Sequence, residues 1–477
     1  MKKIIISLLI FTIIFIISGC KENANTNTTE NKNDTTTDGP ILLENSTSEQ
    51  GTWEFYNERA EAFVKNMANG YFDEAFNMCD TTVKQAMPAA SLQKDVWENI
   101  VAKAGKFIDI DKIDNQTYKQ YHICFVTSKH ENSGVTLRVV FSENGLISGL
   151  LIDSFTTIPT ETVKREGFTD YPVIIGESTD YPLNGILSIP DNATGKVPAV
   201  VLVQGSGPSD LDETIYENKP FRDIADYLAS NGIAVIRYNK RTYTYGLKMT
   251  QELGGSLTVE EEIIQDAILA TKILKSDSRI DENKVFILGH SLGAMLAPRI
   301  DAEGGDYAGL ILLAGSPRSL LLDILYDQQM ASVEDMPEGS DKISALSKME
   351  NYDEQAQALI NLPDDEAKKT AMSGAAAYYY KEMDKYPVSE YIQNITAPFL
   401  ILQGSKDVQV SVDKDFEAYK ELFDGRTNAT FKLYEGLNHL FMPSTGANIT
   451  NIMDEYKIPS HVDNQVLKDI ADWIKSN

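Results

Sequence analysis

Residues 285–297 read VFILGHSLGAMLA, and this stretch decides which fold the sequence predicts for the C-terminal part of the chain. It begins as an unbroken apolar run, passes through small residues around one serine, and continues in a pattern typical of a helix. Residues 289–293 fit the motif G-x-S-x-G, in which the serine stands on a strained turn between a strand and a helix. Two interpretations are open: Ser291 is a nucleophile, or the glycines make a tight connection and the serine caps the helix.

Apolar runs on both sides of this stretch predict a largely parallel sheet. Beyond Thr160, short apolar runs that end in Gly, Ser, Asn or Asp mostly alternate with helical patterns; they are AVVLVQGSG, IAVIRYNKR, KVFILGHS, AGLILLAGS and PFLILQGSKD. Strands without alternating polarity are buried on both faces, so helices should cover both. In such sheets the chemistry gathers at the carboxyl ends of the strands. The small polar residues of these runs lie at those ends.

Two residues further along the chain supply the partners that a nucleophilic serine needs. A serine hydroxyl is activated by a base, which an acid orients. In the α/β-hydrolase order both follow the serine, first the acid and then the histidine. Asp407 follows the predicted strand FLILQGSK, and His439 follows FKLYEGLN. We therefore predict Ser291, Asp407 and His439 as a catalytic triad.

Other residues near these positions compete for the same roles. His290 stands next to the nucleophile, where we expect it to support the turn. His461 precedes the amphipathic run VLKDIADWI, which favours a role at a helix start. Asp413 and Asp415 lie in a helix-like stretch after Asp407, and we expect both to be solvated.

The tetrahedral intermediate needs backbone donors for its oxyanion. One is the N–H of Leu292, directly after the serine, and the other should come from the loop after the third strand. That loop is QGSGP, residues 204–208, and we nominate the N–H of Ser206. The alternative is a plain Gly-Pro turn.

Several longer stretches carry a family resemblance: QGSGPSDLDE, NKPFRDIADYLASNGIAVIRYNKRTYTYG, GHSLGAMLAPRI, LILQGSKDVQV and EGLNHLFM. They resemble a bacterial α/β-hydrolase family of serine esterases, related to the dienelactone-hydrolase and acyl-CoA-thioesterase group, over most of residues 170–477. The resemblance implies Ser291 as nucleophile, Asp407 as acid and His439 as base. Gln204 departs from it, because relatives usually have His there. We expect activity to survive, since the oxyanion donor is a backbone amide, and loop position or substrate preference to differ.

Two further features of this region have open interpretations. Lys240 and Arg241 either meet an anionic group of the substrate or form ion pairs that pin their loop. A mostly helical insertion at about residues 316–394 predicts a lid over the nucleophile. Near its end stand three tyrosines, which either line the substrate pocket or pack the lid onto the body; they are Tyr378, Tyr379 and Tyr380.

The segment before this hydrolase domain, which we place at residues 160–477, predicts a separate α+β domain at 51–155. Helical spacing over 53–67, 72–78 and 89–104 is followed by the β-rich runs HICFVTSK, GVTLRVVFS and GLISGLLID. The pattern resembles a domain of unknown function found N-terminal to bacterial serine hydrolases, with a SnoaL-like cone as the implied fold. His122 and His130 lie here outside any constellation, and we expect them to be structural.

The N-terminus resembles a bacterial lipoprotein signal. Lys2 and Lys3 precede an apolar stretch, and Ser-Gly-Cys ends it, so residues 1–20 form the signal and Cys20 carries the lipid. An ordinary secretory signal or a short membrane anchor is the alternative. Residues 21–50, rich in Asn and Thr, predict a disordered tether. The implied location is the extracytoplasmic face of the bacterial cell membrane.

Composition narrows the function further. The chain has 43 Lys and Arg against 70 Asp and Glu, a formal net charge of −27, which argues against a nucleic-acid partner. No metal-ligand spacing or cofactor motif is present.

We predict a serine-dependent carboxylic ester hydrolase acting on a small ester through an acyl-enzyme. The alternatives are a serine peptidase, a thioesterase or acyltransferase, and a catalytically silent lipoprotein whose N-terminal domain binds an envelope partner. Whether Cys79 and Cys124 pair is left open.

Overall fold

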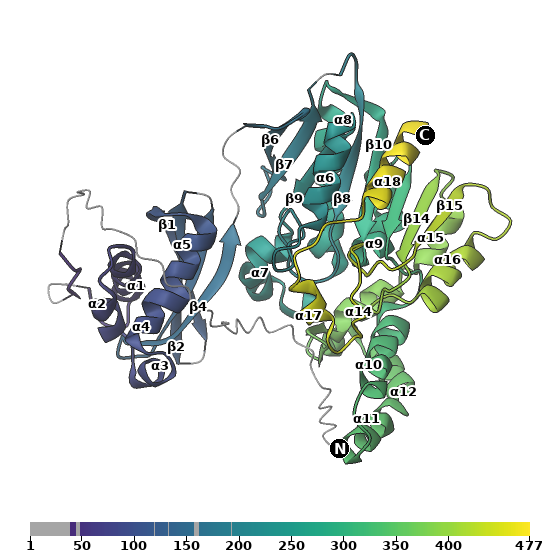
Figure 1. Ribbon diagram of the computed structural model, residues 1–477. Coiled ribbons are helices and arrows are strands. Elements are labelled where there is room, and N and C mark those ends of the chain that lie inside the picture. Colours follow the sequence, from purple (N-terminus) through teal and green to yellow (C-terminus); the bar gives the residue numbers. More distant parts are fainter. Residues whose placement is uncertain (1–38, 44–47, 119, 132, 157–161, 192) are drawn as a thin grey trace. The chain divides into compact units, whose positions relative to one another are not determined.

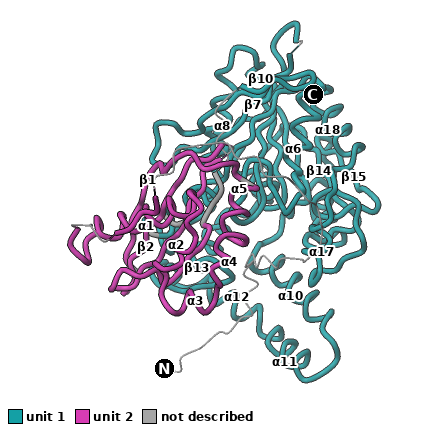
Figure 2. Tube along the Cα trace, turned by 60° about the vertical axis from the view of Figure 1, so that its left-hand side comes forward, with its two compact units in different colours: residues 1–12, 159–477 teal, residues 13–158 magenta. Residues whose placement is uncertain are grey.

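The computed structural model describes residues 39–43, 48–118, 120–131, 133–156, 162–191 and 193–477 (Figure 1). They form two compact units that divide between residues 158 and 159 (Figure 2). The predicted signal at 1–20, the lipidated Cys20 and most of the tether lie outside the described residues. Within the described ranges, no helix has the length and apolar character needed to span a bilayer.

The smaller unit joins helices to an antiparallel sheet of order β1-β2-β3-β4. The helices are α1 (Trp53–Ala68), α2 (Phe72–Asn77), α3 (Thr81–Ala86), α4 (Ala89–Ser91) and α5 (Glu98–Ala104), with a π-helical stretch at Leu92–Trp97 before α5; the strands are β1 (Phe107–Tyr118), β2 (Tyr121–His130), β3 (Gly134–Phe141) and β4 (Ile147–Thr156). Apolar residues of α1, such as Phe63, share one core with strand residues such as Val126 and Val139. This is the α+β arrangement that the period change predicts.

Two elements of this unit were not predicted. Strand β1 has the sequence FIDIDKIDNQTY, and none of its described side chains is fully buried. It lies at the edge of the sheet, so its acids and amides face solvent. The sequence therefore has no clear alternation of apolar and polar residues from which a strand could be predicted. Helix α3 is a short turn whose N-cap, Asp80, accepts from the backbone N–H of Val83.

In the smaller unit, the histidines that we noted in the sequence contact other protein groups, as expected of structural residues. His130 is buried, with Nδ1 3.0 Å from the carbonyl oxygen of Gly105 and Nε2 3.1 Å from Ser128 Oγ. The His122 ring stacks on Tyr56. Cys79 and Cys124 are free, buried thiols, so the pairing left open does not occur.

The larger unit is built on a nine-stranded sheet of order β15-β14-β11-β10-β8-β9-β7-β6-β5. Its strands are β5 (Val163–Lys164), β6 (Phe168–Ile175), β7 (Leu183–Pro190), β8 (Val197–Val203), β9 (Ala234–Tyr238), β10 (Ile280–His290), β11 (Leu310–Leu313), β14 (Phe399–Gly404) and β15 (Ala429–Tyr434). From β9 through β8 to β15 neighbouring strands pair in parallel, whereas β5, β6, β7 and β9 pair antiparallel. The parallel part carries every predicted triad residue at the same edge.

Helices cover both faces of this sheet, as predicted (Figure 1). Alternate strand residues enter two different cores, for example Val201 in one and Val200 in the other. Helices α8 (Gln265–Ser276) and α9 (Leu292–Ile300) pack on the first core; α6 (Pro220–Ser230) and α18 (Asn464–Ser476) pack on the second. Smaller helices are α7 (Arg241–Glu252), α16 (Glu417–Leu422) and α17 (Ile452–Tyr456). The strand order and two helix layers are those of the α/β-hydrolase fold.

The segment between β11 and β14 is mostly helical, as the sequence predicts. It contains α10 (Leu325–Glu334), α11 (Ser340–Met349), α12 (Tyr352–Ile360), α13 (Asp364–Ala367), the short strands β12 (Ala371–Met372) and β13 (Ala375–Ala376), α14 (Ala377–Asp384) and α15 (Val388–Asn394). Helix α14 is tied to α9 by an ion pair in which Arg299 Nη2 lies 2.9 Å from Glu382 Oε1. The insertion therefore contacts the helix that starts directly after Ser291.

Candidate active site

Ser291 stands on a strained turn between β10 and α9. Its φ is +53° and its ψ is −117°, a conformation that costs free energy in a residue with a side chain. A Cβ on Gly289 would lie 2.2 Å from the Gly293 carbonyl oxygen, and one on Gly293 would lie 2.2 Å from that of Val203. Both glycines are thus required by close backbone approach. The Ser291 side chain makes no capping hydrogen bond to α9, so the helix-cap interpretation is wrong.

Asp407 and His439 meet at the carboxyl ends of β14 and β15. His439 Nδ1 lies 2.7 Å from Asp407 Oδ2, and both side chains are buried. The carboxylate also accepts from Gln403 Nε2 and from the backbone N–H groups of Gln409 and Val410. Because Nδ1 donates to the carboxylate, Nε2 is the imidazole nitrogen that can accept a proton.

The turn that carries Ser291 lies against the loop that carries His439. The preceding residue, His290, has Nε2 3.0 Å from the carbonyl oxygen of His439, and the two rings are 4.7 Å apart between centroids. His461 lies elsewhere: its side chain is 86% exposed, and Nδ1 is 3.0 Å from Asp223 Oδ1 on α6. The structure therefore pairs Asp407 with His439, places the turn of Ser291 against the His439 loop, and keeps His461 apart.

The expectation that Asp413 and Asp415 are both solvated is half wrong. Asp413 is exposed, but Asp415 is buried. Its carboxylate accepts from Ser316 Oγ at 2.7 Å and from the Ser411 N–H at 2.7 Å, and it pairs with Arg318 at 3.1 Å. These partners compensate the lost hydration. Ser316 and Arg318 come from a part of the chain about a hundred residues upstream, which the local pattern does not reveal.

The nominated oxyanion loop, residues 204–208, lies beside Ser291. A Cβ on Gly205 would be 3.1 Å from the Ser291 Cβ, and Ser206 is exposed. The Leu292 N–H begins α9 on the other side of Ser291. Gln204, the departure from the family pattern, is buried and its Nε2 donates to the carbonyl oxygens of Tyr238 and Asp210. Its amide ties the loop to the end of β9.

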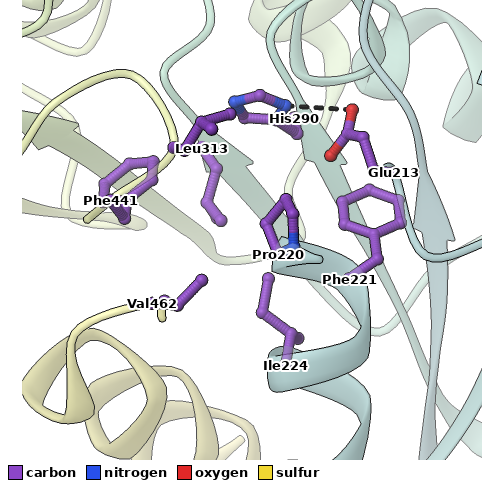
Figure 3. Close-up of a pocket in the computed structure, with 9 residues that line it drawn as sticks. Glu213, Pro220, Phe221, Ile224, His290, Leu313, Phe441 and Val462 are labelled. Carbon is purple, nitrogen blue, oxygen red and sulfur yellow. Dashed lines mark hydrogen bonds and ion pairs between the residues drawn. The ribbon is translucent and has the colours of Figure 1, made fainter. Parts of the chain in front are cut away.

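A buried Glu213–His290 pair lies behind the turn (Figure 3). Glu213 Oε1 lies 3.0 Å from His290 Nδ1 and accepts from the Gly205 N–H at 2.7 Å. Burial by itself lowers the pKa of His290, but the Glu213 carboxylate and the His439 carbonyl oxygen outweigh it, and the pKa is raised. The pair borders a small pocket whose other lining residues are apolar; they are Pro220, Phe221, Ile224, Leu313, Leu440, Phe441 and Val462.

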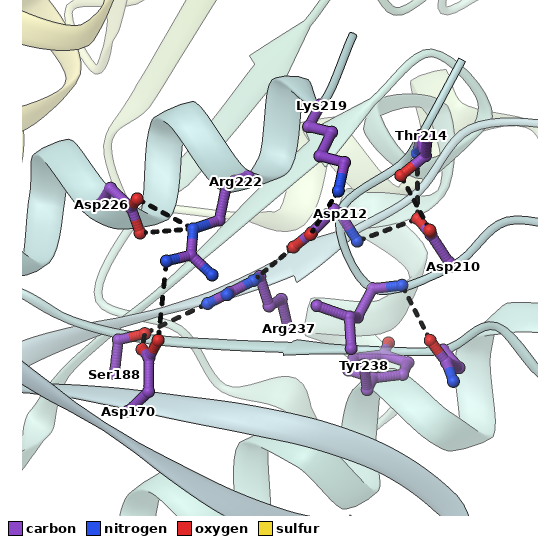
Figure 4. Close-up of polar contacts among 12 residues, drawn as sticks. Asp170, Ser188, Asp210, Asp212, Thr214, Lys219, Arg222, Asp226, Arg237 and Tyr238 are labelled. Atoms are coloured by element: carbon purple, nitrogen blue, oxygen red, sulfur yellow. Dashed lines mark hydrogen bonds and ion pairs between the residues drawn. The ribbon is translucent and has the colours of Figure 1, made fainter. Parts of the chain in front are cut away.

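The loop that carries Glu213 is held by a polar network (Figure 4). Glu213 itself has a φ of +53°. Asp210 accepts from the backbone N–H groups of Asp212 and Thr214 and from the Thr214 hydroxyl. Arg237, which is fully buried, donates from Nε to Asp212 Oδ1 at 2.8 Å. These contacts hold the strained residue against the oxyanion loop.

For Lys240 and Arg241, the structure shows the loop-pinning arrangement. Lys240 is 2% exposed, and its Nζ lies 2.7 Å from the Gly205 carbonyl oxygen, 3.0 Å from that of Gly207 and 2.5 Å from Glu262 Oε1. Arg241 pairs with Asp266 on α8. Both cations are buried in these contacts.

The tyrosine cluster contacts protein groups. The Tyr379 hydroxyl donates to Glu262 Oε2 at 2.8 Å, and that of Tyr380 donates to the Ser373 carbonyl oxygen at 2.9 Å. The Tyr378 ring carries Lys368 Nζ 4.6 Å from its centroid. The Tyr379 contact matches the alternative in which the rings pack the insertion onto the body, whereas the contacts of Tyr378 and Tyr380 lie within the insertion. The pocket role stays a prediction.

Sequence reasoning missed three residues that organise the site: Glu213, Glu262 and Gln403. Glu262 is one of three consecutive glutamates and looks like part of a solvated helix face. Glu213 and Gln403 lie in the quoted stretches QGSGPSDLDE and LILQGSKDVQV, but the sequence assigned neither of them a role. Their roles arise from contacts with Gly205, Lys240 and Asp407. Across the part of the chain that the structure describes, no group of three or more His, Cys, Asp or Glu side chains is arranged to hold a metal ion.

Comparison with known proteins finds a matching family for each of the two units. The family described as "Serine aminopeptidase, S33" matches residues 217–444, and "Protein of unknown function (DUF3887)" matches residues 60–150. Esterase EstD of Thermotoga maritima is 33% identical over 425 residues, which is 88% of this chain and 95% of that protein.

Solved structures that resemble the chain include Est1E from Butyrivibrio proteoclasticus, with 16% identity over 63% of this chain and 99% of that one and a TM-score of 0.37. The Pyrococcus furiosus esterase PF2001 has 17% identity over 67% of this chain and 97% of that one, with a TM-score of 0.40.

Proposed function

The chain belongs to the α/β-hydrolase family that includes Esterase EstD and is a hydrolase of ester bonds, and from this premise we propose a serine-dependent carboxylic ester hydrolase with Ser291, His439 and Asp407 as its triad. One observation carries the proposal. A buried carboxylate–imidazole pair, with 2.7 Å between Asp407 Oδ2 and His439 Nδ1, lies in the loops next to a serine held at a φ of +53°. Nucleophilic catalysis by serine requires an oriented base and a serine on such a turn, and both features support the proposal.

The proposed reaction proceeds through an acyl-enzyme. His439 Nε2 takes the proton of Ser291 Oγ as that oxygen attacks the ester carbonyl carbon. The amides of Leu292 and Ser206 donate to the oxyanion of the tetrahedral intermediate. The intermediate collapses, the alcohol leaves with the proton from His439, and water repeats the sequence to release the acid. Asp407 holds the imidazole and stabilises its protonated form.

The test of this proposal is labelling with a fluorophosphonate, combined with ester turnover. We expect Ser291→Ala to abolish labelling and turnover and His439→Ala to lower kcat by about 10⁴-fold or more. His461→Ala is the matched control, because it removes an imidazole that also contacts a carboxylate, and it should leave kcat unchanged. Turnover that depends on His461 instead of His439 would refute the assignment of the base.

The acyl group and the scissile bond are tested with a substrate panel. The family description "Serine aminopeptidase" makes peptides the rival substrate class. We expect p-nitrophenyl esters to be cleaved with a kcat/KM at least about 10³-fold above that for aminoacyl and peptidyl anilides, because the 33% identical relative is an esterase. A preference for anilides would replace the esterase with a peptidase on the same triad.

We further propose that Cys20 carries lipid and holds the enzyme on the extracytoplasmic face of the cell membrane. The supporting observation is the sequence around it: two lysines, an apolar stretch, then Ser-Gly-Cys. The test compares the chain with its Cys20→Ser variant in an expressing bacterium. Incorporation of labelled palmitate and partition into a detergent phase should depend on Cys20. Equal partition of the two chains would exclude this anchor.

A further inference from the structure

Lys240 is a buried cation whose three N–H donors all have partners, two of them in the oxyanion loop. An ammonium group has three N–H donors. Its three partners are the carbonyl oxygens of Gly205 and Gly207 and the carboxylate of Glu262, at 2.7, 3.0 and 2.5 Å. The side chain is 2% exposed, so this geometry replaces its hydration. Two of the three bonds are made to the backbone of the loop and only one to a carboxylate.

The bond to Gly205 determines the direction of the amide that we nominate as oxyanion donor. The Gly205 carbonyl and the Ser206 N–H belong to one planar peptide unit, in which the two bonds point in opposite directions when the peptide is trans. No cis peptide bond occurs among the described residues. Fixing the carbonyl oxygen on Lys240 therefore fixes the direction of the Ser206 N–H. The cation also polarises the peptide unit, which makes its N–H a stronger donor.

The preceding peptide unit is fixed from the opposite end. The Gly205 N–H donates to Glu213 Oε1 at 2.7 Å, so a buried anion holds the amide before the nominated one. Glycine at 205 has no Cβ, and a Cβ there would contact Ser291 at 3.1 Å. The chain can therefore approach Ser291, and the two charged side chains set the orientation that glycine leaves free.

The contacts of Lys240 extend through Glu262 into the helical insertion. Glu262 Oε1 pairs with Lys240, and Glu262 Oε2 accepts from the hydroxyl of Tyr379 on α14 at 2.8 Å. All three side chains are buried. The backbone of the insertion also approaches the segment before Glu262, because a Cβ on Gly255 would lie 1.7 Å from the Lys368 carbonyl oxygen. An unbroken series of polar contacts thus joins α14 to the oxyanion loop.

We propose that Lys240 is a positioning residue that directs the Ser206 N–H toward the oxyanion. Through Glu262 and Tyr379, the direction of this N–H depends on the position of α14. The inference rests on the proposed function, because it concerns the reaction at Ser291. Displacement of α14 removes the Tyr379 hydroxyl from Glu262 and loosens the pair that holds Lys240 on Gly205. The insertion then controls the oxyanion geometry as well as access to the serine.

The first experiment compares Lys240→Met with Arg241→Met in the full chain. Arg241 is a matched control, because it is the next residue, is equally buried and pairs with a buried aspartate, but it has no bond to the loop. Loss of one oxyanion donor lowers kcat by about 10²–10³-fold. We expect about 10²-fold from Lys240→Met, with KM changed less than about 3-fold. Arg241→Met, compared at equal folded fraction, should change kcat by less than about 3-fold.

The second readout observes the loop without using catalysis. Labelling with ¹³C-carbonyl glycine and ¹⁵N serine restricts the NMR spectrum to amides of serines that follow a glycine, and Ser206→Ala identifies the signal of interest. We expect the Ser206 amide signal to move in Lys240→Met and to keep its position in Arg241→Met. An unmoved signal in Lys240→Met, or an equal shift in Arg241→Met, overturns the proposal.

The link to the insertion is tested with the smaller change Tyr379→Phe, which also serves if Lys240→Met does not fold. Tyr352→Phe is its control, because it removes a buried hydroxyl that bonds within the insertion, to the Leu321 carbonyl oxygen. Loss of one such bond corresponds to about 3–10-fold in kcat. We expect that loss and a moved Ser206 signal in Tyr379→Phe only. Equal behaviour of the two variants overturns the link. Wild-type protein without Ser291-dependent turnover would refute the proposed function, while the Ser206 signal would still decide the positioning role.

Discussion

At the scale of single residues, His290 has an acceptor on each ring nitrogen. Nδ1 faces the Glu213 carboxylate and Nε2 faces the His439 carbonyl oxygen. A neutral imidazole has one N–H, so only the imidazolium donates to both. The direction of the pKa agrees: burial opposes the charge, but Glu213, the His439 carbonyl and the more distant Asp407 carboxylate raise the pKa of His290. The motif residue before the serine thus links the Glu213 carboxylate to the loop that carries His439.

This pair predicts a specific pH dependence for Glu213→Gln. Because the pKa of His290 is raised in the folded chain, the pair stabilises fully below the unfolded value of about 6.5, and the contribution is lost as pH rises through the folded value. We expect Glu213→Gln to lower the free energy of unfolding by about 2–4 kcal/mol at pH 6 and by less at pH 9. Urea unfolding at both pH values checks this, with exposed Glu217→Gln as control. A difference that stays constant or grows with pH contradicts it.

At the scale of elements, the strand-turn-helix unit from β10 to α9 positions the serine by close backbone contact. Gly293 lies on the first turn of α9 and faces the carbonyl oxygens of Val203 and Gln204, at the end of β8 where the oxyanion loop starts. A side chain there would push α9 away from the loop. The glycine is therefore a requirement of packing between three elements, and flexibility is not its purpose.

Substitution of this glycine should damage both stability and activity. In Gly293→Ala the Cβ would lie 2.2 Å from the Val203 oxygen, which belongs to a buried strand and cannot move cheaply. We expect a loss of about 3 kcal/mol or more and at least about 10²-fold in kcat. Gly246→Ala on α7, where a Cβ meets no atom within 4 Å, should gain about 0.5–1 kcal/mol. Thermal unfolding and ester turnover measure both, and a tolerated Gly293→Ala would contradict the packing argument.

At the scale of the whole molecule, the two units differ in thiol content, because the cysteines among the described residues lie in the smaller unit. Apart from Cys20, the chain has only Cys79 and Cys124, and both are buried in the smaller unit. Burial raises the pKa of the Cys79 thiol to about 11 and that of Cys124 to about 12. The thiolate is the reactive form, so both thiols are protected while this unit is folded.

These thiols predict a selective probe of unfolding. In a Cys20→Ser chain at pH 8, we expect a thiol reagent to label Cys79 and Cys124 at least about 10²-fold more slowly than in urea, since the thiolate is scarce and covered. The labelling rate should rise at the urea concentration where the smaller unit unfolds, whereas ester turnover follows the larger unit. Rapid labelling of the native chain would contradict the burial of these thiols.

The sequence by itself determined the fold class and the triad candidates. Both depend on patterns that are local in the chain: apolar runs of strand length, glycines around Ser291, and an acid and a histidine directly after predicted strands. The packing of parallel strands then brings their ends to one edge. The unpredicted β1 shows the limit of this reasoning, because an edge strand needs no apolar alternation.

Only the tertiary structure decided which charged residues are structural. Lys240, Glu213, Glu262 and Asp415 look like surface charges in the sequence, yet each is buried against a partner that is distant along the chain; for Glu213 that partner is His290. The physical reason is that a charge enters the interior only where donors and acceptors compensate its lost hydration, and those partners come together only in the folded chain. The local pattern of VFILGHSLGAMLA is enough to nominate Ser291, whereas only the fold shows which charged side chains contact the loops around it.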